Sequence, residues 1–187
     1  MKRLYVISVL LLSVIGVNAQ SRSYKGFIET GGGFYFGSKS GGTLVFNTSH
    51  GKAFGNIFLG GGTGIERLWI KNWSYIKDYV SEDGWDGWIG TKVLKGVNVP
   101  VFANIKGIWD NNKISPMFDV KAGLNLGYAF GLFGEAGTGC RFDLGKTALA
   151  ATIFFKAVNE GQNMVTDDPK YADGWFTSAG IKVAFEF

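Results

Sequence analysis

The stretch SAGIKVAFEF, residues 178–187, closes the sequence and decides the fold that we predict. Its residues alternate between an apolar set and a set that includes glycine, lysine and glutamate. Successive side chains of a β-strand point to opposite faces of the sheet. The alternation therefore predicts a strand with one apolar face, and Phe187 at its end belongs to that face.

A strand with an aromatic residue last, and apolar residues two, four, six and eight positions before it, resembles the C-terminal strand of Gram-negative outer-membrane β-barrels. The resemblance implies that Phe187 belongs to an assembly signal. It also implies the barrel-assembly machinery of the outer membrane as a partner.

The other end of the sequence has the pattern of a secretory signal peptide. Met1-Lys2-Arg3 is followed by an apolar run, residues 4–17, and by the small-residue cleavage site Val17-Asn18-Ala19. The run is about 14 residues long, and a membrane-spanning helix needs roughly 20. We therefore expect cleavage after Ala19, a signal peptide at residues 1–19 and one outer-membrane β-barrel domain at residues 20–187.

The composition points to an all-β protein. The chain has 29 glycines and 3 prolines among 187 residues, and 16% of its residues are aromatic. After the signal peptide it contains no apolar run long enough for a spanning helix, so it can cross a bilayer only as a closed barrel. Without Lys2 and Arg3 of the signal peptide the net charge falls from +4 to +2, which is too weak to indicate a nucleic-acid partner. Cys140 is the only cysteine and excludes an internal disulfide.

Alternation of apolar and polar residues recurs along the rest of the chain and predicts eight strands of about ten residues. The strands are expected at Tyr24–Phe36, Thr43–Ser49, Phe54–Trp69, Val97–Trp109, Phe118–Tyr128, Leu132–Asp143, Thr147–Val158 and Gly174–Phe187. An even number of such strands predicts an eight-stranded antiparallel up-and-down transmembrane β-barrel. Turn residues at Gly37–Gly42 and Ser49–Lys52 separate the first three strands.

The lengths of the connections predict how the barrel lies in the membrane. The two longest, Ile70–Gly96 and Asn159–Asp173, follow the third and the seventh strand. Outer-membrane barrels have long extracellular loops and short periplasmic turns. We therefore expect both long connections outside the cell and both chain termini in the periplasm.

Four segments resemble small outer-membrane β-barrel proteins of Bacteroidota-type bacteria. They are NTSHG at 47–51, FLGGGTG at 58–64, VPVFANIK at 99–106 and KISPMFDVKAG at 113–123. The resemblance implies an eight-stranded barrel in the outer membrane, and it brings no catalytic residue with it. We expect no cofactor, no metal site and no enzymatic activity.

The polar face of the predicted strands carries nearly equal numbers of acids and bases. Charges of opposite sign in a low-dielectric interior should pair, and an eight-stranded barrel is only wide enough for its side chains to fill it. We therefore expect an interior plugged by charge pairs, with a narrow passive pore for small solutes as the alternative. The network is predicted to comprise Glu29, Glu66, Lys106, Asp119, Lys121, Glu135, Arg141, Asp143, Lys156, Lys182 and Glu186, with Phe58, Phe102 and Phe154 also pointing inward.

Two further classes of function remain open. A soluble periplasmic lipocalin-like binder would need the faces of every strand inverted, because lipocalins are polar outside and apolar within. A lipid-modifying enzyme would need a histidine beside a serine nucleophile, and His50 follows Ser49. Because neighbouring residues of a strand point to opposite faces, a structural role is favoured for His50.

The long connection after the third strand is rich in aromatic residues. It can be an interfacial girdle in contact with outer-membrane lipid, since Trp and Tyr favour the headgroup level. It can also be a platform for an extracellular glycan or protein ligand, since aromatic side chains make rigid contacts. The candidate binding residues are Trp73, Tyr75, Tyr79, Trp85 and Trp88. The overall prediction is a non-enzymatic outer-membrane barrel with a structural or surface-interaction role.

Overall fold

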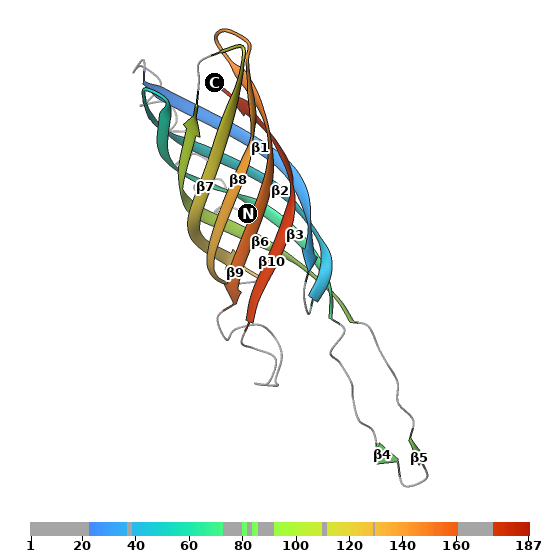
Figure 1. Cartoon of the computed structure of the whole chain (residues 1–187). Helices are drawn as coiled ribbons and strands as arrows, with labels where there is room; N and C mark the ends of the chain where they lie inside the picture. Colours follow the sequence, from blue (N-terminus) through green and yellow to red (C-terminus); the bar gives the residue numbers. More distant parts are fainter. Residues whose placement is uncertain are drawn as a thin grey trace, which may run out of the picture.

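The computed structural model describes residues 23–36, 39–72, 80–81, 84–85, 92–109, 112–128, 130–160 and 174–187. Eight strands form one closed antiparallel barrel in the order β1-β10-β9-β8-β7-β6-β3-β2 (Figure 1). This confirms the predicted eight-stranded antiparallel barrel. The strands are β1 (Tyr24–Phe36), β2 (Lys39–Phe54), β3 (Ile57–Asn72), β6 (Lys92–Ile108), β7 (Ile114–Gly127), β8 (Gly131–Asp143), β9 (Ala148–Glu160) and β10 (Gly174–Glu186).

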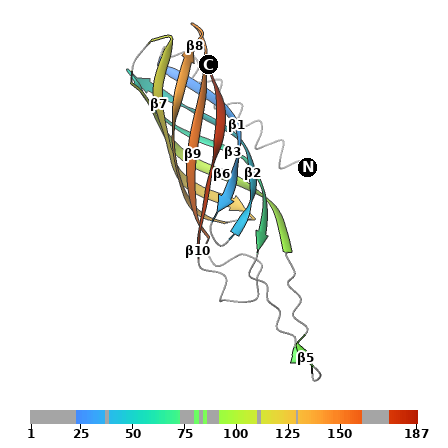
Figure 2. The ribbon, with the colours of Figure 1, turned by 45° about the vertical axis from the view of Figure 1, so that its right-hand side comes forward.

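The barrel closes where the first strand meets the last. β1 pairs with β10 from Phe27↔Glu186 to Phe36↔Thr177. Phe187 extends this ladder through two backbone hydrogen bonds with Gly26, at 2.9 and 3.0 Å. The start of β1 and the end of β10 therefore lie at the same end of the barrel, and Figures 1 and 2 both show it opposite the end where β3 ends and β6 begins.

The connection between β3 and β6 contains two short strands, β4 (Val80–Ser81) and β5 (Gly84–Trp85), which form a separate two-stranded sheet. β3 and β6 themselves pair out to Asn72↔Lys92, which is farther than the predicted ends at Trp69 and Val97. The described residues include no helix that is long and apolar enough to cross a membrane.

The turn predicted at Ser49–Lys52 is wrong, because these residues lie within β2. Ser49 pairs with Gly62 and Lys52 with Leu59, and the chain turns only at Gly55-Asn56, where Gly55 has a φ of 60°. The part of the predicted turn from Lys39 to Gly42 likewise belongs to β2. Serine and glycine favour turns, but the strands of this barrel also carry small and polar residues, such as Ser49 and Gly51, on their inner face.

The outer surface of the barrel is apolar and the inner face is largely polar. On β9, for example, Ile153 is 65% exposed, whereas its neighbours Thr152 and Phe154 are buried. The same alternation holds on β10, where Ile181 is 62% exposed and Lys182 is buried. This is the pattern of a barrel that presents its apolar face to lipid.

Glycines on the inner face make room for aromatic rings. A Cβ atom at Gly62 would lie 2.6 Å from the ring of Phe102 and 2.4 Å from the carbonyl oxygen of Thr48. A Cβ atom at Gly60 would lie 2.5 Å from the ring of Phe58. These β3 glycines therefore allow phenylalanines to fill the barrel.

Candidate functional site

The interior of the barrel holds the charged residues that the sequence singled out. All of them are buried except Asp143, the last residue of β8, whose side chain is 36% exposed. They belong to three separate clusters, which sequence alone did not distinguish. We call them the central cluster, the Glu66 pair and the rim cluster.

The central cluster joins three carboxylates to three lysines across the lumen. Lys106 Nζ lies 2.5 Å from Glu29 Oε1 and 2.9 Å from Asp119 Oδ2. Lys121 Nζ contacts Glu29 and lies 3.2 Å from both Asp119 and Glu135. Lys182 Nζ contacts Glu135 and lies 3.7 Å from Asp119. The residues come from β1, β6, β7, β8 and β10, so the formally neutral cluster ties together more than half of the strands.

The Glu66 pair links β3 with β9. Lys156 Nζ donates to Glu66 Oε2 at 2.7 Å, and both side chains are buried. The hydroxyl groups of Thr43 and Tyr35 donate to Glu66 Oε1 at 3.0 and 3.4 Å. The carboxylate therefore has partners on both oxygens, which a buried charge requires.

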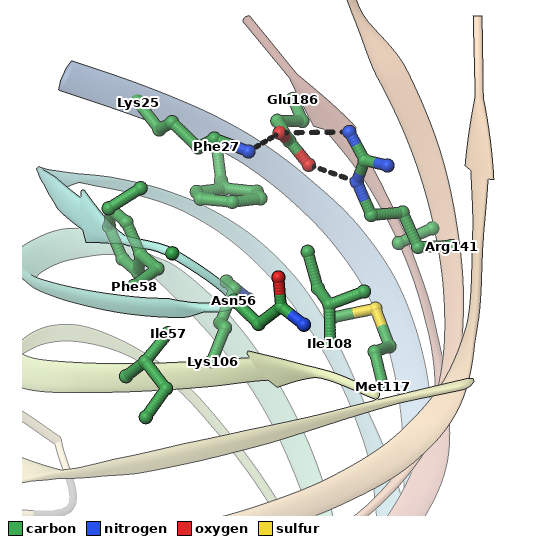
Figure 3. Close-up of a pocket in the computed structure, with 13 residues that line it drawn as sticks. Lys25, Phe27, Asn56, Ile57, Phe58, Lys106, Ile108, Met117, Arg141 and Glu186 are labelled. Atoms are coloured by element: carbon green, nitrogen blue, oxygen red, sulfur yellow. Dashed lines mark hydrogen bonds and ion pairs between the residues drawn. The ribbon is translucent and has the colours of Figure 1, made fainter. Parts of the chain in front are cut away.

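The rim cluster lies at the end of the barrel where the chain terminates, and Figure 3 shows its main contacts. Arg141 donates to Glu186 from Nε at 2.7 Å and from Nη2 at 3.1 Å. Lys25 contacts the same carboxylate, and Asp143 Oδ2 lies 3.5 Å from Arg141 Nη1. A fork of this kind is the strong geometry for an arginine and a carboxylate.

Lys25 is an interior base that the predicted network does not include. With it, each cluster has as many bases as acids: three and three, one and one, and two and two. Lys25 lies four residues before Glu29 in the same strand, so the alternation of β1 would have placed it on the inner face.

Phenylalanine rings surround the interior lysines. Four lysines each have their Nζ close to the centroid of a phenylalanine ring. The pairs are Lys106 with Phe27 at 4.8 Å, Lys121 with Phe102 at 5.4 Å, Lys156 with Phe133 at 4.6 Å, and Lys182 with Phe154 at 4.8 Å. Rings at this distance stabilise an ammonium group by cation–π attraction. Phe58, Phe102 and Phe154, predicted to point inward, are all buried, and Phe58 packs edge-on against Phe27.

Apolar side chains fill the remaining interior. One cluster comprises Tyr35, Leu68, Phe102, Phe133 and Val158, and a second comprises Met117, Ala150 and Ala184. The cavity in Figure 3 lies beside the rim cluster and is also lined by Phe58 and Met117. Its volume of about 20 Å³ is enough for about one water molecule.

His50 and Ser49 lie on opposite faces of β2. Ser49 is buried in the lumen, whereas His50 faces outward, where its Nδ1 lies 2.6 Å from the hydroxyl of Tyr24 and its Nε2 lies 2.8 Å from the hydroxyl of Thr48. The ring of Phe187 packs edge-on against His50. Ser49 and His50 therefore do not form a nucleophile and base, and His50 contacts the strand that closes the barrel.

The remaining candidate residues lie in several places. Most of the aromatic candidates lie outside the described residues, namely Trp73, Tyr75, Tyr79 and Trp88, and so does the predicted signal peptide. Trp85 is described, and it pairs with Val80 in the two-stranded sheet. Cys140 is exposed and lies on the apolar outer face of β8. Among the residues that the structure describes, no group of three or more His, Cys, Asp or Glu side chains is placed to hold a metal ion.

No family model and no curated protein matches the chain. Among solved structures, its fold is similar to that of Neisserial surface protein A, with a TM-score of 0.51 and 8% identity over 87% of this chain and 95% of that chain. A major outer membrane protein from Thermus thermophilus is 14% identical over 88% of this chain and 99% of that chain, with a TM-score of 0.40. At 8% identity the first likeness shows the barrel fold alone. The resemblance to Bacteroidota-type barrels stays a prediction.

Proposed function

We propose that this chain is a non-enzymatic outer-membrane β-barrel with a closed interior and a structural or surface-interaction role. The observation that carries the proposal is the division between the two faces of the sheet. Three formally neutral charge clusters and their phenylalanines fill the inside, while large apolar side chains cover the outside. Such a surface is suited to lipid, and such an interior is suited to a plug.

Membrane fractionation tests the location. The chain with its N-terminal segment is expressed in a Gram-negative host, and the outer-membrane fraction is run on a gel with and without boiling. We expect the protein in that fraction, with faster migration before boiling because a closed barrel stays compact in detergent. A periplasmic protein without a heat shift would contradict the proposal and favour the lipocalin-like binder.

Planar-bilayer recording tests the closed interior. Purified barrel should produce no steady single-channel steps, because the central cluster and the surrounding rings leave little space in the lumen. Steady steps that change in Glu135→Ala or Arg141→Ala would instead support the narrow passive pore.

The surface-interaction role rests on the sequence of the β3–β6 connection. Its aromatic residues are suited to a glycan or protein ligand, and Trp85 and Trp88 are the ones that we propose as contacts. Cells that display the wild-type barrel should bind a glycan or surface protein more strongly than cells that display the Trp85→Ala or Trp88→Ala variant. Equal binding would leave the structural role as the better description.

A further inference from the structure

Two cations on the outer surface differ from the bases of the three interior clusters. Arg67 on β3 and Lys95 on β6 are exposed, and they alternate with residues that face the lumen. Neither forms an ion pair within the described part of the chain, whereas the six bases of the interior clusters all contact a carboxylate. An outward cation on an apolar barrel is costly unless it reaches the interface or an anion.

The pairing register brings the two cations together. Arg67 is paired with Val97, and Trp69, two residues further along β3, is paired with Lys95. Arg67 and Lys95 are therefore diagonal neighbours, with Cβ atoms about 7 Å apart. A Cβ atom at Gly42 would lie 2.7 Å from the Trp69 ring, so this ring leans over β2 and away from Lys95. One phosphate group could contact both cations.

The two cations lie at the outer limit of the apolar band. A strand rises by about 3.3 Å per residue, and the strands of such barrels are tilted by about 40°. From Ile57 to Arg67, β3 therefore rises by about 25 Å along the barrel axis. The apolar band of outer-membrane barrels is also about 25 Å high. The ladder between β6 and β7 ends at Asn98↔Gly127, so Lys95 lies beyond the end of β7. Trp69 is typical of the headgroup level at this depth.

Among the strand residues whose side chains the structure describes, the outward charges at this end lie on β3 and β6. The other described outward residues here are apolar or uncharged, and none is a carboxylate. Directly below the cations, toward the middle of the barrel, lie the exposed side chains of Ile65 and Val99. A cationic pair above an apolar surface complements a phosphorylated headgroup above its acyl chains. This arrangement favours a lipid over free phosphate.

We propose that Arg67 and Lys95 bind the phosphate of a phosphorylated lipid in the outer leaflet, with Trp69 beside them at the headgroup level. The inference rests on the proposed function, because it needs the barrel in the outer membrane with this end outward. The guanidinium of Arg67 matches the oxygens of a phosphate, and Lys95 adds a point charge. The site recognises the phosphate group of the lipid and does not distinguish between lipids that carry different acyl chains.

Native mass spectrometry of the folded, detergent-purified barrel tests this site. The probes are bisphosphorylated lipid A and the same lipid without its phosphates. Two cations contribute about 1 kcal/mol each near an anionic surface, so the double variant Arg67→Gln/Lys95→Gln should bind phosphorylated lipid A roughly 30-fold more weakly. Higher salt should weaken wild-type binding. The matched control is Lys52→Gln, which removes an exposed outward cation at the other end of the barrel and should have little effect.

The outcomes separate the site from the fold. If every variant keeps the heat shift and only the double variant loses phosphate-dependent binding, the site is supported. Equal binding of the two lipids, or an equal loss in Lys52→Gln, would overturn the site and leave the barrel in place. A wild-type chain without a heat shift would overturn the proposed function, and the lipid site with it.

Discussion

At the scale of single residues, the interior charges matter because each one depends on a partner. Glu66 and Lys156 form a pair of their own, with two hydroxyl groups completing the carboxylate. Burying two charges costs hydration energy that their attraction restores only when both are present. The pair should therefore be more sensitive to the loss of one member than to the loss of both.

Glu66→Gln should lower the free energy of unfolding by about 3–5 kcal/mol, because it leaves the Lys156 ammonium buried without a carboxylate. Lys156→Met should be similarly costly. The double variant should recover most of the loss, since no unpaired charge remains. Urea unfolding of the barrel in lipid vesicles measures all three, and additive effects in the double variant would contradict the coupling.

Gly62→Ala should destabilise the barrel by about 1–3 kcal/mol, because the new methyl group would meet the Thr48 carbonyl and the Phe102 ring. Gly134→Ala is the matched control, because its Cβ would have nothing within 4 Å. The control should change stability by less than about 1 kcal/mol. Equal effects in the same unfolding experiment would mean that Gly62 does not make room for the ring.

At the scale of the strands, the alternation of apolar and polar residues predicted well which face of the sheet each residue occupies, but it predicted poorly where the strands begin and end. The outward positions of β7 and β9 follow directly from the sequence, because a one-residue slip would move every apolar side chain inside. The end of β2 could not be predicted in the same way. Ser49 and Gly51 suit an inner face as well as they suit a turn, and the actual turn is fixed by the φ of Gly55.

Which charged residues form each cluster could not be predicted from the sequence either. Glu29 and Lys121 are 92 residues apart, and they meet across the lumen rather than between neighbouring strands. Alternation predicts which residues face inward, but not which of them meet. That depends on the stagger and tilt of the closed barrel.

Ile153→Lys should lower the free energy of unfolding in lipid vesicles by about 2–4 kcal/mol, because this side chain lies on the outer face near the middle of β9. Leu149→Lys, on the same face near the end of β9, should cost only about 0–1 kcal/mol, since the cost falls toward the interface. A stable, more soluble Ile153→Lys protein would show that this face does not contact lipid.

At the scale of the whole molecule, the even number of strands places both termini at the same end of the barrel. The turns between β2 and β3, β6 and β7, and β8 and β9 lie at the end that carries Phe187, and the β3–β6 connection lies at the other end. The short turns are expected to be periplasmic and the long connections extracellular. The lipid site and the aromatic connection would then share the cell surface.

Single-cysteine labelling in intact cells can test this orientation. In a Cys140→Ser background, Ser81→Cys in β4 should react with a membrane-impermeant maleimide added to whole cells, because β4 belongs to the connection expected outside. Lys146→Cys, in the exposed turn between β8 and β9, should react only after the outer membrane is permeabilised. The reverse pattern would place the termini outside the cell. Arg67 and Lys95 would then face the periplasmic leaflet, where phosphorylated lipid A is not their partner.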